Sequence, residues 1–256
     1  MQKPKGEDRC IHCGQRLVEE TDDHVFPASW YPDSTPQSVQ RWKAPSCRVC
    51  NGTSGKKEQE LFIRLALCVD PRKIEALGIS AKLARTFGIG EGISPADKQK
   101  RTAFRGRILS ETKPVSEENQ AHIIPGLGPH PGFPIESQRE IGIPAQLVYD
   151  VAKKIVRGCE FWLLDGRIID PPYKLDVYMV HPEEIPGIVR MFDSINAVTL
   201  GPGFKVRRAA VKEDPLSAMY QVEIWGTWTL YFTVLPPEDA SPEEATEESP
   251  KPSATG

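Results

Sequence analysis

Two Cys-x-x-Cys pairs constrain this chain more than any other feature of its sequence. Cys10 and Cys13 form the first pair, and Cys47 and Cys50 form the second. Two intervening residues allow both thiolates of a pair to turn onto one metal ion, whereas disulfide frameworks belong mainly to small secreted domains. We therefore expect a four-thiolate structural zinc site, with a redox pair or unbound thiols as the alternatives. His12 lies inside the first pair and is expected to be exposed, because four thiolates already complete a zinc site.

The composition is that of an ordinary globular protein, with 39% hydrophobic and 26% charged residues. The polar amino terminus is unlike an export signal, and no apolar run approaches the roughly 18 to 20 residues that a bilayer span needs. We therefore expect a cytoplasmic protein without membrane contact. The charge is uneven, because residues 1–113 carry a net charge of +6 while residues 238–256 carry −5. The basic half permits a phosphate-bearing partner, although ordinary surface charge explains the same count.

The residue pattern predicts an α+β fold in five segments. Residues 1–70 form the cysteine-containing unit, 71–113 a helical basic segment, 114–144 a linker or loop rich in Pro and Gly, 145–236 an α+β domain with an antiparallel sheet, and 237–256 a disordered acidic tail. The pattern within 145–236 contains no grouping of side chains that is typical of catalysis. The candidate functional residues therefore lie in the first two segments.

Within residues 1–70 we expect a hairpin followed by a helix. A short strand follows the first cysteine pair, and a second strand over DHVFP ends at Pro27. Residues 28–45 contain three aromatic residues among Pro, Ser, Asp and Gln, which indicates an irregular loop anchored by its rings. The second cysteine pair then leads into an amphipathic helix from about Ser54 to Cys68.

The α+β domain is expected to begin with a helix that runs into an apolar strand over residues 145–164. A strand over 173–180, a helix over 182–195 and three strands within 204–235 complete it. These last strands are separated by turn residues, which predicts an antiparallel meander.

The residues between and after the cysteine pairs form a recognisable order. Asp23 and His24 lie between the pairs, and Asn51 follows the second pair directly. The sequence CxxC, then Asp-His-Val-x-Pro, then CxxC-Asn resembles the HNH endonuclease family over residues 8–60, about a quarter of the chain. This resemblance implies a zinc-stabilised ββα-metal finger, similar to a treble clef, and hydrolysis of phosphodiester bonds in DNA. RNA is the alternative polymer.

The residue types suit this chemistry, because phosphodiester hydrolysis needs a base to activate water and a cation to take up charge on the phosphate. His24 is the candidate general base, since its unperturbed pKa lies nearest to neutrality. The resemblance implies that Asp23 and Asn51 are the ligands of a catalytic Mg²⁺ or Mn²⁺ ion. Lys56 and Lys57 lie near the helix N-terminus, where the helix dipole favours a phosphate, and are candidate nucleic-acid contacts.

A second basic group follows on a helix that we expect to begin at Ser94 and Pro95, after a shorter helix that Gly88 ends. This helix either contacts nucleic acid or is only solvated on its charged face, because its apolar residues also suit an amphipathic helix that covers a core. The candidate nucleic-acid contacts on it are Lys98, Lys100, Arg101 and Arg105.

One position departs from the family pattern. The middle asparagine of HNH proteins usually lies about five residues before the second cysteine pair, where this chain has Trp42. Gln40, Gln37 or Ser38 would then have to hold the imidazole in its tautomer. The alternative function is a degenerate HNH domain, a non-catalytic zinc-finger module that binds nucleic acid or protein. In such a module His24 is a buried structural residue and Asn51 is only a helix N-cap.

Overall fold

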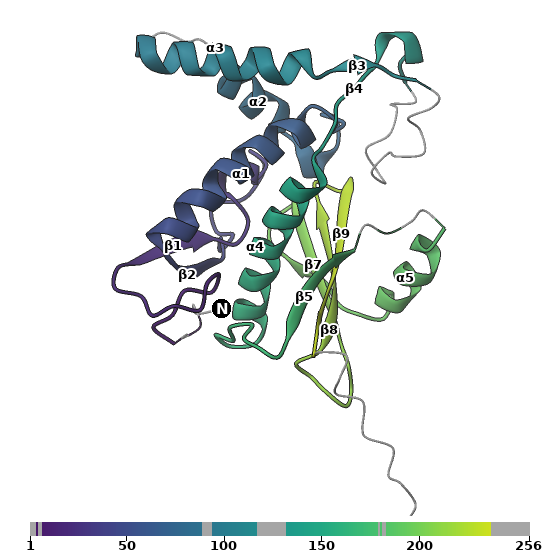
Figure 1. Ribbon diagram of the computed structural model, residues 1–256. Coiled ribbons are helices and arrows are strands. Elements are labelled where there is room, and N and C mark those ends of the chain that lie inside the picture. Colours follow the sequence, from purple (N-terminus) through teal and green to yellow (C-terminus); the bar gives the residue numbers. More distant parts are fainter. Residues whose placement is uncertain are drawn as a thin grey trace, which may run out of the picture.

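The computed structural model combines helices with antiparallel sheets (Figure 1). The residues that it describes are 4, 7–88, 94–116, 132–178, 180 and 183–236. Strand β1 (Glu20–His24) pairs antiparallel with β2 (Lys43–Cys47), and α1 (Arg48–Ala66) begins directly after β2. No helix within these residues is long and apolar enough to cross a membrane.

The first strand pair differs from the hairpin that we expected. The partner of β1 is not the segment before DHVFP but β2, which lies beyond the aromatic loop, and in this register His24 lies opposite Lys43. Residues 8–17 do not extend into a strand because they close on themselves around the first cysteine pair, where Arg9 forms an isolated bridge with Arg16. The expected order of two strands and a helix is present, but with different strand boundaries.

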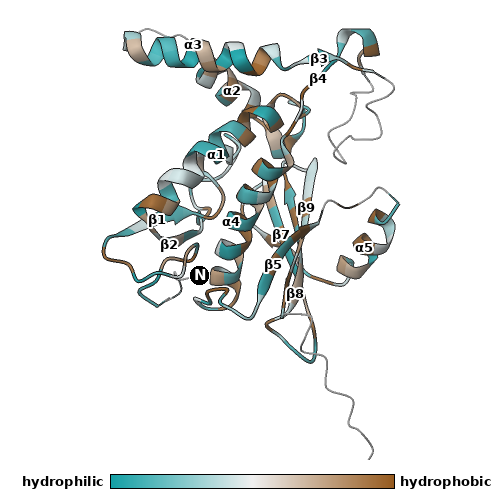
Figure 2. Ribbon diagram, viewed as in Figure 1, coloured by the Kyte–Doolittle hydropathy of each residue, from teal (hydrophilic) through white to brown (hydrophobic). Residues whose placement is uncertain are grey.

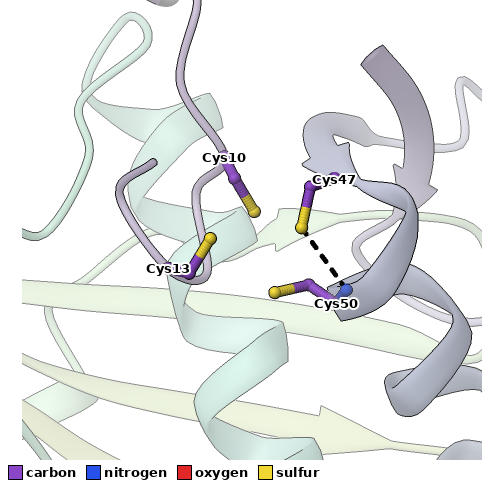
Figure 3. Close-up of side chains that lie close together, drawn as sticks. All are labelled: Cys10, Cys13, Cys47 and Cys50. Atoms are coloured by element: carbon purple, nitrogen blue, oxygen red, sulfur yellow. Dashed lines mark hydrogen bonds between the residues drawn. The ribbon is translucent and has the colours of Figure 1, made fainter. Parts of the chain in front are cut away.

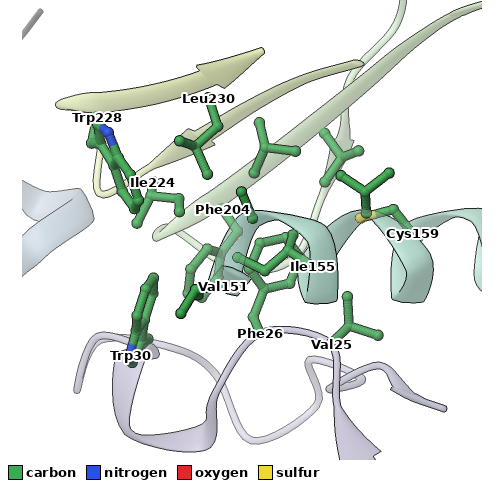
Figure 4. Close-up of a cluster of buried hydrophobic side chains, with 14 of the residues drawn as sticks. Val25, Phe26, Trp30, Val151, Ile155, Cys159, Phe204, Ile224, Trp228 and Leu230 are labelled. Carbon is green, nitrogen blue, oxygen red and sulfur yellow. The ribbon is translucent and has the colours of Figure 1, made fainter. Parts of the chain in front are cut away.

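The aromatic loop between β1 and β2 is anchored by its rings, as predicted. It contains the short 3₁₀ helix η1 (Ala28–Trp30), and its three fully buried rings are Trp30, Tyr31 and Trp42. The centroid of Trp30 lies 5.7 Å from that of Trp225, and Phe26 lies 4.3 Å from Phe204. The amino-terminal unit therefore packs on residues of the carboxy-terminal sheet, and one hydrophobic cluster contains side chains of both (Figure 4).

The two helices of the basic segment agree with their sequence signals. Helix α2 (Ile79–Phe87) ends at Gly88, after the 3₁₀ helix η2 (Ile74–Ala76). Helix α3 (Pro95–Ser110) begins after Ser94, whose hydroxyl accepts a hydrogen bond from the backbone N–H of Asp97 at 3.1 Å. Side-chain capping of this kind satisfies a backbone donor that has no partner within the helix. Figure 2 shows that α3 is largely hydrophilic along its length.

Helix α4 (Ala145–Leu163) occupies the whole stretch that we expected to divide into a helix and a strand. Its second half is apolar on several sides because α4 lies between α1 and the large sheet, so that Ile155, Cys159 and Trp162 are all buried (Figure 1). A helix that is covered on two sides loses the one-sided pattern that marks a surface helix, and its sequence then looks like that of a buried strand.

The large sheet has five antiparallel strands in the order β5-β9-β8-β7-β6, and its last three strands form the expected meander. The short strands β3 (Lys113–Pro114) and β4 (Arg139–Glu140) pair with each other, and α5 (Ile185–Phe192) precedes β6. The expected acidic tail and the centre of the Pro/Gly-rich segment lie outside the described residues. The strands of the large sheet are β5 (Lys174–Tyr178), β6 (Val198–Thr199), β7 (Phe204–Ala210), β8 (Ala218–Ile224) and β9 (Trp228–Leu235).

Candidate functional site

The four cysteines of the two pairs converge on one point (Figure 3). The sulfur atoms of Cys10, Cys13, Cys47 and Cys50 all lie within 4.8 Å of one another. A tetrahedral zinc ion with Zn–S bonds of about 2.3 Å separates its sulfurs by about 3.8 Å, so this group is close to the geometry that zinc requires. No other group of three or more Cys, His, Asp or Glu side chains in the described ranges is placed to hold a metal ion.

Local backbone structure positions each pair. Gly14 has a φ of +71°, and its N–H donates to the carbonyl of Cys10 at 2.8 Å, which closes the turn of the first pair. Cys47 is the N-cap of α1, and its sulfur accepts the backbone N–H of Cys50 at 3.4 Å. Burial opposes ionisation of Cys10, but the backbone N–H groups that donate to its sulfur, first that of Cys47, lower its pKa to about 6. Cys10 is therefore favoured as a thiolate, the form that binds zinc, whereas burial is the largest cause that raises the pKa of Cys50 above its usual value.

His24 lies at the end of β1 and is half-buried. Burial is the largest cause that lowers the pKa of its imidazole below 6.5, and the nearby positive charges of Lys43 and Lys154 lower it further. Its ring has no hydrogen-bond partner in the part of the chain that the structure describes. The imidazole is therefore neutral at pH 7 and free to accept a proton.

Asp23 precedes His24 but its carboxylate lies on the other, buried face of β1. Both carboxylate oxygens are engaged: the Nε2–H of His12 donates to Oδ2 at 2.9 Å, and the ammonium of Lys154 lies 3.1 Å from Oδ1. Burial raises the pKa of Asp23, but these two partners outweigh burial and hold the pKa below its usual value. The expectation that His12 is exposed was wrong, since its side chain is only 7% exposed. The carboxylate of Asp23 provides the partner that keeps the imidazole inside.

Lys154 of α4 lies at the centre of this polar group. Its ammonium contacts Asp23 Oδ1, Glu58 Oε1 at 2.5 Å and the backbone carbonyl oxygen of His24. These oxygens come from β1 and α1. The side chains of Lys154, Asp23 and Glu58 are 5%, 6% and 12% exposed. We call His12, Asp23, Glu58 and Lys154 the Lys154 cluster. In it, an internal ammonium takes the place that a small cation would occupy among converging oxygens.

A divalent ion on Asp23 and Asn51 does not fit this arrangement without a rearrangement. The side-chain amide of Asn51 donates to the hydroxyl of Thr21 at 3.1 Å, and Thr21 shares a face of β1 with Asp23. Asn51 therefore lies on the same side of β1 as Asp23, whereas the side chain of His24 is on the other side. The carboxylate of Asp23, however, is already neutralised by Lys154, so a Mg²⁺ or Mn²⁺ ion would have to displace that ammonium. The role of Asp23 and Asn51 as metal ligands stays a prediction.

Trp42, at the position of the missing asparagine, is a core residue. Its ring stacks on that of Trp162 in α4, with centroids 5.3 Å apart and an interplanar angle of 2°. Its backbone carbonyl accepts the N–H of Val25 at 2.9 Å, which extends the pairing of the two chain segments beyond β1. The suggested substitutes, Gln40, Gln37 and Ser38, are all exposed. Trp42, the residue before β2, thus packs against α4.

The candidate nucleic-acid contacts differ in their surroundings. Lys56 is exposed, whereas Lys57 forms an ion pair with Asp150 of α4, with 2.7 Å between Nζ and Oδ2. The pair joins α1 to α4, so Lys57 has a structural partner. The candidates on α3 are all exposed, and these are Lys98, Lys100, Arg101 and Arg105.

The Lys154 cluster is the part of the site that the sequence analysis missed. One signal was present: Lys154 follows Val151 by three residues and precedes Gly158 by four, which puts a lysine on the apolar face of α4. A lysine is almost never fully buried unless it is paired, so this position demanded a carboxylate partner. Which carboxylate it meets depends on how α4 packs against β1 and α1, and no sequence pattern contains that information.

Comparisons of the chain with family models, with curated proteins and with solved structures find no match. Functional conclusions therefore depend on the residues of the site alone. These residues provide a zinc site of four thiolates, a neutral imidazole with cations beside it, and a carboxylate that is closed off by an internal lysine.

Proposed function

We propose that this chain is an HNH-type endonuclease that hydrolyses phosphodiester bonds in DNA, with His24 as the general base. The observation that carries the proposal is the convergence of the four cysteines, which ties the first cysteine pair to the first turn of α1, with Asp23 and His24 on a strand between the two pairs. This is the arrangement expected of a ββα-metal finger. The zinc ion would be structural, because four thiolates leave no open position for a substrate.

In the proposed reaction, His24 removes a proton from water, and the resulting hydroxide attacks the phosphorus in line with the leaving oxygen. The bond between phosphorus and the leaving oxygen breaks, and this oxygen keeps the electron pair and takes up a proton from water. The depressed pKa of His24 keeps its ring neutral, which is the form that accepts the proton. Lys43 and Arg41 add positive charge beside the ring, and Lys43 is partly exposed. The ammonium of Lys43 also lies 3.6 Å from Oδ2 of Asp22, so a phosphate at His24 would share Lys43 with that exposed carboxylate. Asp23 and Asn51 would hold a Mg²⁺ or Mn²⁺ ion only after the ammonium of Lys154 moved away from Asp23, and such an ion would stabilise negative charge on the leaving oxygen.

The test is the nicking of supercoiled plasmid by the zinc-loaded full chain, with Mg²⁺, with Mn²⁺ and without an added divalent ion. We expect wild-type protein to nick the plasmid and His24→Ala to lose this activity. Thermal melting of both proteins establishes that the variant is folded. Nicking that persists in His24→Ala at the wild-type rate would refute the assignment of the base.

A second candidate function is the binding of nucleic acid without cleavage. It is favoured by the ion pair between Asp23 and Lys154 and by the buried Trp42, which together remove two of the family's usual side chains from any reaction. Wild-type protein that retards DNA in a gel but never nicks it, with any of the metals, would establish the binding function and exclude the endonuclease.

A further inference from the structure

A cleft of about 850 Å³ lies between α1, α2 and α3. Its cationic lining comes from two helices, with Lys82 and Arg85 on α2 and Lys100 and Arg101 on α3, and none of its lining residues is acidic. Phe104 of α3 adds an aromatic wall. Lys98 and Arg105, which lie on the same helix, are not part of the lining. The basic residues of α3 thus divide into those that face the cleft and those that do not.

Most of the positive charge in the cleft is not neutralised by the protein. Asp33 is the acidic partner of the α2 cations, at 3.3 Å from Lys82 and 3.8 Å from Arg85. Within the described residues, the one hydrogen bond of the Arg101 side chain is to the backbone carbonyl oxygen of Arg85, at 3.4 Å. Lys100 has no ion-pair partner among the described residues. One carboxylate therefore faces four cations, and the cleft is complementary to a ligand with several negative charges.

Part of the cleft wall lies close to His24 in the sequence. Its wall includes Ala28 and Ser29, which follow β1 closely in the chain. Ala28 is the fourth residue after His24, so the backbones of these two residues are at most about 14 Å apart.

We propose that this cleft binds backbone phosphates of the nucleic acid that reaches His24. The proposal rests on the proposed function for the identity of the ligand, but the binding that it describes does not need cleavage. Lys100 and Arg101 are the contacts whose charges are free, and the α2 cations reinforce them. Phosphates are the shared chemistry of DNA and RNA, and separate binding measurements identify the polymer.

The test measures binding by fluorescence anisotropy with the zinc-loaded full chain carrying His24→Ala, which prevents cleavage during titration. The probes are a labelled 20-base-pair DNA duplex and a 20-nucleotide RNA single strand. We expect Lys100→Ala combined with Arg101→Ala to weaken binding to the preferred probe by at least about tenfold. The slope of log K against log salt should fall in magnitude by about 1.8 for the duplex or about 1.4 for the single strand.

The matched control combines Lys98→Ala with Arg105→Ala, which removes the same charge from the same helix outside the cleft. We expect this control to weaken binding less than about threefold, since it loses only long-range attraction. Equal weakening by both double variants, or no weakening by the cleft variant, would overturn the proposal, as would the absence of binding to either probe. Melting curves of both variants establish that they are folded.

The same proteins separate this inference from the proposed function. If plasmid is nicked by wild type but the cleft variant binds normally, the cleft proposal fails while the endonuclease stands. If wild type never nicks but the cleft variant alone loses binding, the cleft proposal stands without the endonuclease.

Discussion

Replacement of Lys154 by methionine tests the central polar group of the site. Methionine is close to lysine in length, so the main change is the loss of the ammonium from between Asp23 and Glu58. Removal of one partner from a buried ion pair typically costs about 3–5 kcal/mol, because the other charge stays buried without compensation. The His12 hydrogen bond to Asp23 remains, which places the expected loss at the lower end of this range. Urea denaturation at pH 7, followed by tryptophan fluorescence, measures it.

Lys57→Met is the matched control. The ion pair of Lys57 with Asp150 has a separation of 2.7 Å, but its lysine side chain is 41% exposed, against 5% for Lys154. Exposed pairs contribute about 0–1 kcal/mol, so the control should lose less than about 1 kcal/mol. Equal losses in the two variants would refute the argument that burial makes the Lys154 cluster costly to disrupt.

The pH dependence of this difference has a definite sign. The pKa of Asp23 is lower in the folded protein than in the unfolded chain, so its contribution to stability is present above the unfolded pKa of about 3.9 and is lost as the pH falls through the folded pKa. Lys154→Met removes one cause of that low pKa. The free-energy difference between wild type and variant should therefore shrink as the pH is lowered from 7 toward 3, and a difference that grows on acidification would contradict the assignment.

Three further predictions concern the zinc site, the packing of α4 and the base. Cys47→Ala should lose the zinc ion and unfold the region around β1 and α1, since structural zinc contributes about 10–16 kcal/mol in comparable peptides. Native mass spectrometry measures the zinc content, and retention of one ion per chain would contradict this prediction. Gly158→Ala should lower the melting temperature, because the added Cβ would lie 2.5 Å from Val25 Cγ2. Such overpacking costs about 1–3 kcal/mol, whereas the gain in helix propensity is about 1 kcal/mol. Gly106→Ala, which meets nothing within 4 Å, should instead raise it, and the same sign in both variants would contradict the steric argument. Nicking by wild type should rise with pH through a midpoint below 6.5, because the lowered pKa of His24 keeps the base neutral down to that pH; a midpoint above 7 would contradict it.

Local sequence signals predicted the elements whose causes are local. Ser94 begins α3 by capping its first turn, Gly88 follows the last residue of α2, and the turn residues between three apolar segments predicted β7, β8 and β9. The strand predicted within residues 145–164 is part of α4 because packing on two sides removes the periodicity that distinguishes a helix. The partner of β1 was mispredicted for a related reason, since strand pairing is decided by contacts across the aromatic loop.

The candidate site likewise has features that local sequence predicted and features that only the tertiary structure decided. The spacing of the cysteine pairs was sufficient to predict the four-thiolate group, because two residues between thiols leave few geometries other than a shared metal ion. His24 was selected as the candidate base from its neighbours in sequence, and that role stays a prediction. The ion pair between Asp23 and Lys154 joins residues that are 131 positions apart, and only the packing of α4 against β1 and α1 brings them together. Residue type and spacing determine which groups are present, whereas burial and long-range contacts decide which of them are free to react.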